Sequence, residues 1–362
     1  MTDGRRAGAA GTPTGAKTGV TSLAWLALAG SGLLYGYNWV VMKSALKYES
    51  SAVFAASRVL LGAVFLFLVL LALRKPLLPT NWPLTIVVGL FGMTGSIGLS
   101  VWALASGGAG KTSVLVYSMP VWLLLMSWFI LGERLRGYQW LFVVVALIGL
   151  VFVITPWKPE GSLTGNLLGV AAGVCSAASG VLAKLLFRDR RVEILTLNAW
   201  QMLFGSIPLV IVALATTGGG KLWSWSHWYL VTLLYNVILV CGVSLFFWFY
   251  SLRHLSAGTA GLGRLAAPVI GVVASWVQLG EQPDRYEAVG IVLILAGLFA
   301  LAAQQIVSER RAARRVTGSA AAAEVVEASE VVGAAELVSV EMTEPPEALL
   351  EEQRPPGRSS TI

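Results

Sequence analysis

Charged side chains are scarce in this sequence, and long apolar runs take their place. Asp, Glu, Lys and Arg make up 12% of the 362 residues, against about a quarter in ordinary soluble domains. Hydrophobic residues reach 56%, and the mean hydropathy is +0.74. Runs of roughly 20 apolar residues are long enough to cross a bilayer as helices. This composition excludes a soluble globular domain and predicts an all-α polytopic membrane protein embedded in the lipid bilayer.

Cysteine and histidine are scarcer still, with two residues of each. Cys175 and Cys241 stand alone in apolar runs, which leaves no metal-binding spacing and at most one disulfide. We interpret both as small buried hydrophobic side chains. His227 and His254 fall at the ends of apolar runs and have no acidic partner inside the membrane. The sequence therefore predicts no metal site, no cofactor and no catalytic residue, which argues against a membrane enzyme.

One stretch of the chain, residues 104–138, occurs twice. Six distinctive residue types recur at a fixed offset of 148 positions, without a gap. The matched pairs are Gly110 and Gly258, Pro120 and Pro268, Trp128 and Trp276, Leu131 and Leu279, Gly132 and Gly280, Glu133 and Glu281, and Tyr138 and Tyr286. Agreement at one offset indicates an internal duplication of a hydrophobic unit.

Ten apolar runs are expected to cross the membrane. They are 21–46, 52–73, 83–105, 112–131, 138–156, 163–187, 193–215, 227–251, 259–279 and 286–307. With a cytoplasmic N-terminus, one side receives Arg5, Arg6, Lys17, Arg74, Lys75, Arg134, Arg136, Arg188, Arg190, Arg191, Arg253, Arg310, Arg311, Arg314 and Arg315. The other side receives only Lys47, Lys111, Lys158, Lys221 and Arg285. This is the positive-inside asymmetry, so we expect both termini in the cytoplasm.

Each copy of the duplicated unit holds five expected spans. Because five is odd, the second copy must enter the membrane upside down, and such inverted repeats are a hallmark of secondary transporters. We expect repeats at 21–156 and 163–307, with the substrate site near the midplane between them. Residues 1–20 are expected to form a cytoplasmic tail. Residues 308–362 are rich in Glu, Ala and Pro, so they are predicted to form a disordered acidic tail, with a partly helical 321–341 as the alternative.

Pro120 and Pro268 occupy matching places in the two copies. A proline inside a helix removes one hydrogen bond and frees the carbonyl four residues earlier, here that of Val116 or Arg264. Broken helices are tolerated in membranes where the gap meets protein or a polar cavity. We therefore expect helix breaks or hinges near the substrate site; structural kinks without substrate contact are the alternative.

Lys43, Arg58, Lys184 and Arg264 are the cationic groups inside the expected spans, and no Asp or Glu lies in the core of any span. Buried charge in a membrane is costly and suggests function, and partly buried cations attract carboxylates strongly. The sequence thus favours an anionic or zwitterionic substrate. The alternatives are that both lysines snorkel to the interface, that Arg58 pairs with helix carbonyls, and that Arg264 anchors the inner interface.

Polar and aromatic side chains at helical spacing suggest a cavity wall. Tyr35, Asn38 and Trp39 share a face of the first span with Lys43. Further wall candidates are Tyr117 in the fourth span, Ser179 in the sixth and Asn236 in the eighth.

The segment 106–112 is similar to a phosphate-binding loop, but Ala105 stands where that motif requires glycine, and the loop joins two expected spans. Thr112 or Ser113 is better explained as the N-cap of the next helix. The excess of positive charge faces the anionic inner leaflet, so we expect no nucleic-acid partner.

The sequence resembles the drug/metabolite transporter superfamily, EamA type, over residues 21–307. The resemblance rests on Gly36, Tyr37, Asn38, Trp39, Lys43, Arg58, Trp200, Gln201, the two prolines and the repeated Leu-Gly-Glu. It implies ten helices in two inverted five-helix repeats and a plasma-membrane exporter of small polar metabolites, such as amino acids or related organic acids. An exporter of drugs or other amphipathic compounds is one alternative, and a channel or scaffold is another. The substrate, a coupling ion or exchange substrate, and the oligomeric state stay open.

Overall fold

The computed structural model describes residues 14–132, 137, 139–154, 163–187, 192–218, 226–255, 265–304 and 307. The chain divides into two compact units, Met1–Gln305 and Ile306–Ile362. Only Val307 of the second unit is described, so the helices and their packing belong to the first unit. The predictions for the acidic tail and for residues 1–13 lie outside the described residues.

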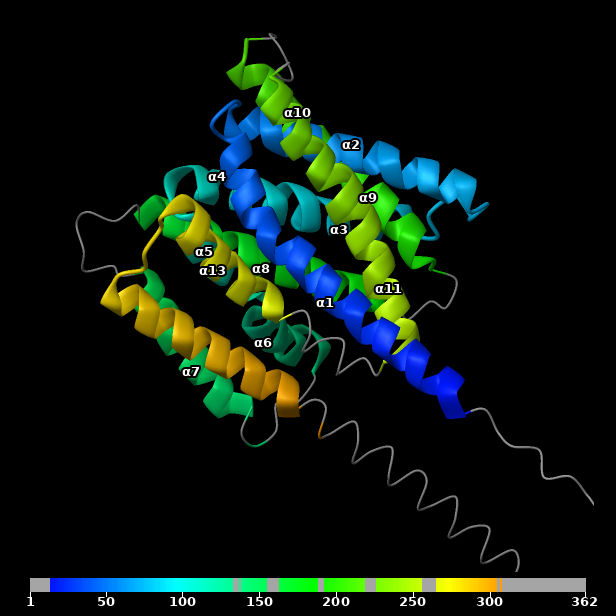
Figure 1. Cartoon of the computed structure of the whole chain (residues 1–362). Helices are drawn as coiled ribbons and strands as arrows, with labels where there is room; N and C mark the ends of the chain where they lie inside the picture. The colour runs from blue at the N-terminus through cyan, green and yellow to red at the C-terminus, as the bar shows by residue number, and fades with distance from the viewer. Residues whose placement is uncertain are drawn as a thin grey trace, which may run out of the picture. The chain divides into compact units, whose positions relative to one another are not determined.

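The described residues of the first repeat form helices joined by short connections (Figure 1). These elements are α1 (Thr14–Ala45), α2 (Ser51–Ala72), α3 (Trp82–Gly89), η1 (Leu90–Gly98), α4 (Leu99–Ser106), α5 (Ala109–Val116), α6 (Met119–Leu131) and α7 (Gln139–Ile154). Helix α1 begins seven residues before the expected first span, inside the segment predicted to be a tail. The helix therefore extends beyond the apolar run that marks it in the sequence, and the cytoplasmic location of residues 1–20 stays a prediction.

The second repeat follows the same order. Its elements are α8 (Leu163–Leu186), α9 (Ile194–Thr216), α10 (His227–Leu234), η2 (Tyr235–Ser244), α11 (Leu245–His254), α13 (Ala266–Leu279) and a last helix, Arg285–Gln304. The described residues contain no strand, which agrees with the predicted all-α class.

Seven helical segments in the described ranges are long and apolar enough to cross a membrane. They are Ser51–Ala72, Trp82–Ser106, Ala109–Ile130, Leu163–Leu186, Ile194–Thr216, His227–Ser244 and Arg285–Gln304. Helix α1 and the shorter apolar helices α7 and α13 are not among them. Large apolar side chains such as Leu26, Phe129 and Val277 are exposed on the protein surface, as expected where lipid covers them. The protein is polytopic, and the count of ten spans stays a prediction.

The two repeats share local backbone features. Each contains a helix whose middle is a π-helix, η1 after α3 and η2 after α10. Gly132 and Gly280, which are 148 residues apart, end α6 and α13 with the same dihedral angles, φ 67° and ψ 16°. Both donate their N–H to a serine carbonyl, Ser127 O or Ser275 O. Glycine adopts this left-handed conformation at little cost, which explains why both positions carry it.

The helix contacts follow a reciprocal pattern. Helix α1 packs on η2, α11 and α13, and α8, its counterpart in the second repeat, packs on η1, α4, α5 and α6. Helix α2 contacts η2, as its counterpart α9 contacts η1, and α2 and α9 pack on each other. Figure 1 shows α1 crossing the molecule between α13 and α11. Each repeat therefore presents equivalent helices to the other.

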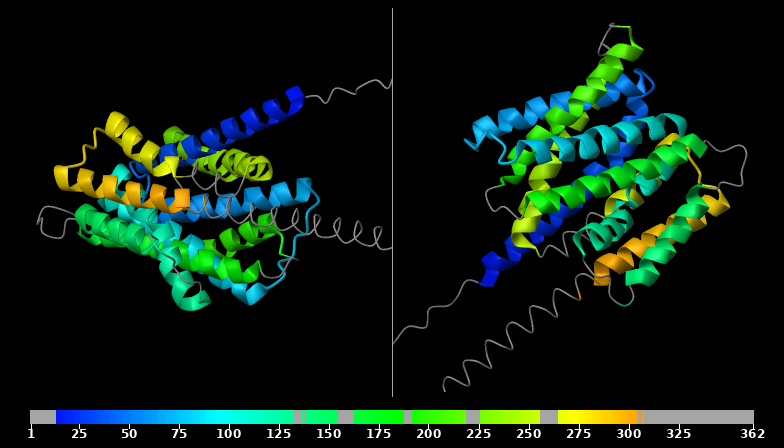
Figure 2. Two further views of the ribbon diagram at one scale, coloured as in Figure 1. Left: turned by 90° about the horizontal axis from the view of Figure 1, so that it is seen from below. Right: turned by 180° about the vertical axis from the view of Figure 1, so that it is seen from behind.

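Helix α7 and the last helix lie side by side in both views of Figure 2. Their contact is very close, since a Cβ added to Gly149 would lie 2.8 Å from Gly290 O, and one added to Gly290 would lie 2.6 Å from Gly149 O. Small residues let membrane helices approach in this way.

Candidate functional site

Arg58 on α2 lies in the protein interior with 9% of its surface exposed. Its Nη1 donates to the Met42 sulfur of α1 at 3.0 Å, and the Cys241 side chain of η2 and Tyr35 of α1 lie in its neighbourhood. A guanidinium is costly to bury unless it is paired, and a thioether is a weak acceptor. Its planar fork of donors suits a carboxylate, so the side chain can bind an anionic group from within the protein.

The side chains of Asn38 on α1 and Asn236 on η2 each contain an unsatisfied hydrogen-bond acceptor. Asn38 Nδ2 donates to the Met42 sulfur at 3.1 Å, so its side chain lies close to that of Arg58. Asn236 on η2 uses Nδ2 for Thr232 O at 2.9 Å, and Tyr235 beside it donates to Leu34 O of α1 at 3.0 Å. The Oδ1 atoms of both asparagines are buried without a partner in the described part of the chain, as is Gln304 Oε1. Each leaves an acceptor that a donor on a small molecule would satisfy.

Aromatic rings flank this group on the other side of α1. The Trp39 and Tyr117 rings meet edge to face, with centroids 6.2 Å apart. A Cβ at Gly271 of α13 would lie 3.3 Å from the Trp39 ring, so the pair lies where α1, α5 and α13 meet. Helices α1 and α2 both contact η2, and we define the buried polar group as six side chains on these three elements: Tyr35, Asn38, Met42, Arg58, Asn236 and Cys241. The Trp39–Tyr117 pair lies next to this group along α1.

The remaining predicted site residues lie elsewhere. Lys43 Nζ donates to Leu104 O and Gly107 O, both at 2.6 Å, so it caps the C-terminal end of α4. Ser179 donates to Val88 O at 3.1 Å and joins α8 to α3. Lys184 is exposed near the end of α8, and Arg264 lies outside the described residues.

Pro120 and Pro268 stand in the first turns of α6 and α13 rather than in helix interiors. In the fourth predicted span the helix stops at Val116 and restarts at Met119. Pro120 therefore follows a break, in a position where the missing N–H costs little. A Cβ at Gly173 of α8 would lie 3.2 Å from Val116 O, so the freed carbonyl packs against protein.

At the end predicted to face outward, the loop between α4 and α5 is held by the second repeat. Glu281 Oε2 accepts from the N–H groups of Ala109 and Gly110, at 2.6 and 3.3 Å. These donors have no partner inside the helix, and a carboxylate also suits the positive end of the helix dipole. The predicted cap by Thr112 or Ser113 was wrong, because α5 begins at Ala109 and its cap comes from a residue distant in sequence.

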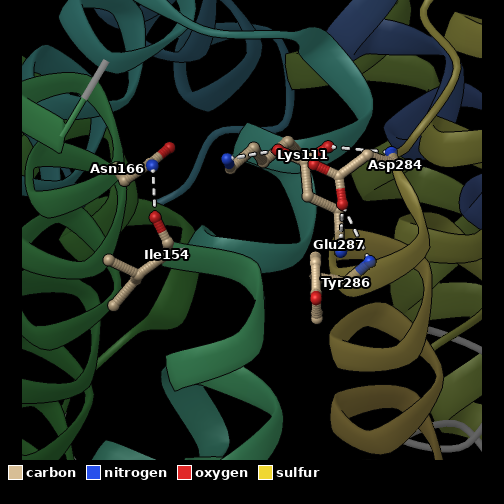
Figure 3. Close-up of polar contacts among 6 residues, drawn as sticks. All are labelled: Lys111, Ile154, Asn166, Asp284, Tyr286 and Glu287. Carbon is tan, nitrogen blue, oxygen red and sulfur yellow. Dashed lines mark hydrogen bonds and ion pairs between the residues drawn. The ribbon is translucent and has the colours of Figure 1, made fainter. Parts of the chain in front are cut away.

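Lys111 forms a second connection between the repeats (Figure 3). Its Nζ lies 2.5 Å from Glu287 Oε1 of the last helix, and the two side chains are 14% and 20% exposed. Asp284 Oδ1 accepts from Tyr286 N and Glu287 N, while Glu287 Oε2 accepts from Asp284 N. This reciprocal capping fixes the Glu287 carboxylate beside Lys111.

A cavity of about 330 Å³ adjoins these connections. Its lining includes Gly108, Lys111, Asn166, Ser275, Glu281 and Glu287. Asn166 Nδ2 donates to Ile154 O at 3.0 Å, which ties α8 to the end of α7 (Figure 3). Glu281 and Glu287 had no predicted role, although the Asp284–Glu287 spacing is the signal of a capping box.

At the opposite end, the loop after α2 is bound to the start of α9. Glu193 caps α9 through Thr196 N at 2.9 Å and lies 3.3 Å from Lys75 Nζ. Partial burial raises the pKa of Glu193, but the hydrogen bonds from Thr196 and Lys75 and the Lys75 charge together lower it below its ordinary value. Thr196 and Trp200 also donate to Pro76 O and Leu77 O, both at 2.6 Å.

A larger cavity, about 730 Å³, is almost entirely apolar. It is lined from α2, η2, α11 and the start of α9, by residues that include Phe65, Val69, Ile194, Ile238 and Phe246, with Glu193 at its edge. Such a cavity accommodates hydrocarbon rather than a charged metabolite.

Relatives of this chain are known in bacteria. A protein named uncharacterized transporter YoaV, from Bacillus subtilis strain 168, is 30% identical over 272 residues, which cover 74% of this chain and 92% of that protein. Two proteins named probable amino-acid metabolite efflux pump cover 74% of this chain and 90% of their own length. They come from Salmonella typhimurium strain LT2, at 25% identity, and Escherichia coli strain K12, at 24% identity.

A solved crystal structure shares the fold, with a TM-score of 0.54 at 19% identity, over 80% of this chain and 99% of that one. The EamA-like transporter family matches the present sequence twice, at residues 22–155 and 163–303. The two matches confirm the duplication and the resemblance inferred from the sequence motifs. The chain therefore belongs to the EamA-like transporter family and is a multi-pass membrane transporter rather than an enzyme.

Proposed function

We propose that this protein is a secondary transporter that exports small polar metabolites bearing a carboxylate, such as amino acids or related organic acids. It works by alternating access in the plasma membrane, with both termini in the cytoplasm. The buried polar group carries the proposal, because it combines a desolvated guanidinium with two unsatisfied amide oxygens. Arg58 binds the carboxylate, and the oxygens of Asn38 and Asn236 accept from an ammonium or hydroxyl group.

The reciprocal helix contacts support an inverted arrangement of the repeats. Equivalent helices meet equivalent helices across the molecule, as a two-fold relation between the repeats requires. Five spans in each repeat place the axis of that relation in the membrane plane. Helix α1 contributes residues to both the buried polar group and the Trp39–Tyr117 pair, so a movement of α1 during rocking of the halves displaces both.

The names of two relatives as probable amino-acid metabolite efflux pumps support the same substrate class. Export of amphipathic compounds is the second candidate function. The apolar cavity of about 730 Å³ favours it, as does the Trp39–Tyr117 pair, since aromatic faces attract organic cations.

The test is export from cells preloaded with radiolabelled amino acids, organic acids and the amphipathic cation ethidium. Arg58→Met removes the charge from the buried polar group at similar volume, and Arg58→Lys keeps it without the planar fork. The matched control is Lys184→Met, which removes an exposed cation from α8.

For the carboxylate exported by the parent, Arg58→Met should raise the KM roughly tenfold or more, because a hydrogen bond to a charged group contributes about 1.5–3 kcal/mol. The KM of Arg58→Lys should lie between those of the parent and Arg58→Met, and the KM of Lys184→Met should match that of the parent. All variants should be equally abundant in the membrane. If the cells export only ethidium, and the Arg58 variants export it as the parent does, the second candidate function replaces the proposal.

A further inference from the structure

The contacts at the predicted outer end are divided between the two repeats in an informative way. Lys43 binds the last carbonyls of α4, and both belong to the first repeat. Glu281 and Glu287 belong to the second repeat, yet their carboxylates bind the N-terminal end of α5 and Lys111. The two carboxylate contacts therefore join one repeat to the other, whereas the Lys43 contacts join residues of the same repeat.

Close packing lies directly beneath these contacts. A Cβ added to Gly110 would lie 2.4 Å from Ser275 Oγ and 3.2 Å from Val272 Cα, so α5 and α13 touch almost backbone to backbone. Ser275 is 1% exposed although it lies beside the 330 Å³ cavity. The seam between the repeats is thus closed just inside the carboxylate contacts.

The charges are arranged so that closure is stable but reversible. The Lys111–Glu287 pair is mostly shielded from solvent, so its Coulombic attraction is screened less than that of an exposed surface pair. The bonds from Glu281 satisfy two N–H groups that water would satisfy once the loop moved away. The adjoining cavity provides the polar space for that exchange.

We propose that Glu281 and Glu287 form the outer gate of the transporter, which closes on the α5 N-terminus and Lys111 and must release them before substrate leaves. The inference rests on the proposed alternating access and adds the residues that control its outer step. The gate is a pair of carboxylates from one repeat that binds the cationic and N–H groups of the other.

The test measures how fast a cysteine at Ser275 reacts with a membrane-impermeant maleimide added to intact cells, in a chain whose Cys175 and Cys241 are replaced by alanine. Lys111→Glu and Glu287→Lys each place like charges at the gate, and the double variant restores opposite charges in reversed order. Arg285→Glu, an exposed position on the same connection, is the matched control. Glu281→Gln is a milder variant that removes one carboxylate charge.

We expect each single reversal to label roughly tenfold faster than the parent, because like charges in contact repel strongly, and Glu281→Gln to label faster as well. The double variant should regain the slow labelling rate of the parent, and Arg285→Glu should keep that rate. Parental labelling in the single variants and in Glu281→Gln, or fast labelling in the double variant, would overturn the gate.

Labelling needs no substrate, which separates the two hypotheses. The expected labelling pattern in a protein that exports none of the tested compounds would reject the proposed function and leave the gate intact. If the protein exports the carboxylate but the gate variants label at the parental rate, only the gate is rejected.

Discussion

Lys43 and Glu281 show how single charges act on helix ends in this protein. The lysine binds the carbonyls at the C-terminal end of α4, and the glutamate binds the N–H groups at the start of α5. Each charge is opposite to the partial charge of the helix end that it contacts. The ammonium of Lys43 also interacts with Glu281, so the short loop between α4 and α5 is held from both sides.

Arg58 and Lys43 looked equivalent in the sequence, since both are cations in apolar runs. The structure separates them: Lys43 has two carbonyl partners at 2.6 Å, whereas Arg58 contacts a weak sulfur acceptor. The cation set was therefore predictable, but the partners were not, because they come from helices distant in sequence. The anionic-substrate hypothesis now depends on Arg58 more than on the lysines.

Glu193 gives a prediction with a defined pH range. Its lowered pKa means that the ionised form is favoured in the folded state, so its contribution to stability is full above its unfolded pKa and is lost as the pH falls through the folded value. At pH 7, Glu193→Gln should therefore reduce stability by at most about 1 kcal/mol, because the amide oxygen can still accept from Thr196 N and the half-exposed Lys75 pair adds little. The loss comes from replacing a charged acceptor by a neutral one.

The measurement is the Tm of the purified protein from pH 7 to pH 3. The difference between parent and variant should be constant from pH 7 to 6 and shrink in acid below the ordinary pKa of 4.5. Glu49→Gln, which removes a charge from a residue that does not cap a helix, is the control. A difference that grows in acid would contradict this role of Glu193.

At the scale of elements, the helix break before Pro120 was predictable, but its geometry was not, and the segment before Leu265 lies outside the described residues. Pro120 and Pro268 indicated interruptions, and the fourth predicted span does stop between Val116 and Met119. The π-helices η1 and η2 were not foreseen, since their sequences have no proline and their residue pattern is that of an ordinary apolar helix. Met93 of η1 is in close contact with Gly205 of α9, and such tertiary packing cannot be predicted from the sequence pattern of one helix.

Helices α5 and α13 provide the sharpest prediction at this scale. A Cβ at Gly110 would lie 3.6 Å from Ser275 Cβ, within the range of disulfides, about 3.5–4.5 Å. In the chain without native cysteines, the pair Gly110→Cys and Ser275→Cys should cross-link and hold the two helices together. Oxidation should then reduce export of the transported carboxylate by at least about tenfold, and a reducing agent should restore it.

The two single cysteine variants are the controls, and neither should respond to oxidant. A fully cross-linked double variant that exports as fast as its dithiol form would show that α5 and α13 need not separate. Membrane abundance of the reduced form establishes that the tight contact of Gly110 with Val272 tolerates the new side chain.

At the scale of the whole molecule, the duplication and the family were predictable because they depend on sequence spacing alone. The 148-residue offset reappears in the structure as the matching glycine ends of α6 and α13. The outer gate was not predictable in the same way. Glu281 was visible as part of a repeated motif, but its partners Ala109 and Gly110 lie in the other repeat.

The proposed inverted arrangement of the repeats, the close contact of α5 with α13 and the buried guanidinium of Arg58 all support one proposal, that substrate crosses by alternating access. A channel also passes small molecules, but it does not expose its site to one side at a time. Carriers saturate and exchange substrate across the membrane, and these properties are measurable without knowledge of a coupling ion.

The most direct measurement is counterflow with the purified protein in liposomes. The liposomes are loaded with an unlabelled amino acid or organic acid that the cells export, and a trace of the same labelled compound is added outside. We predict a transient accumulation of label that saturates with substrate and is lost in Arg58→Met. Flux that rises linearly without accumulation would contradict alternating access and favour a channel.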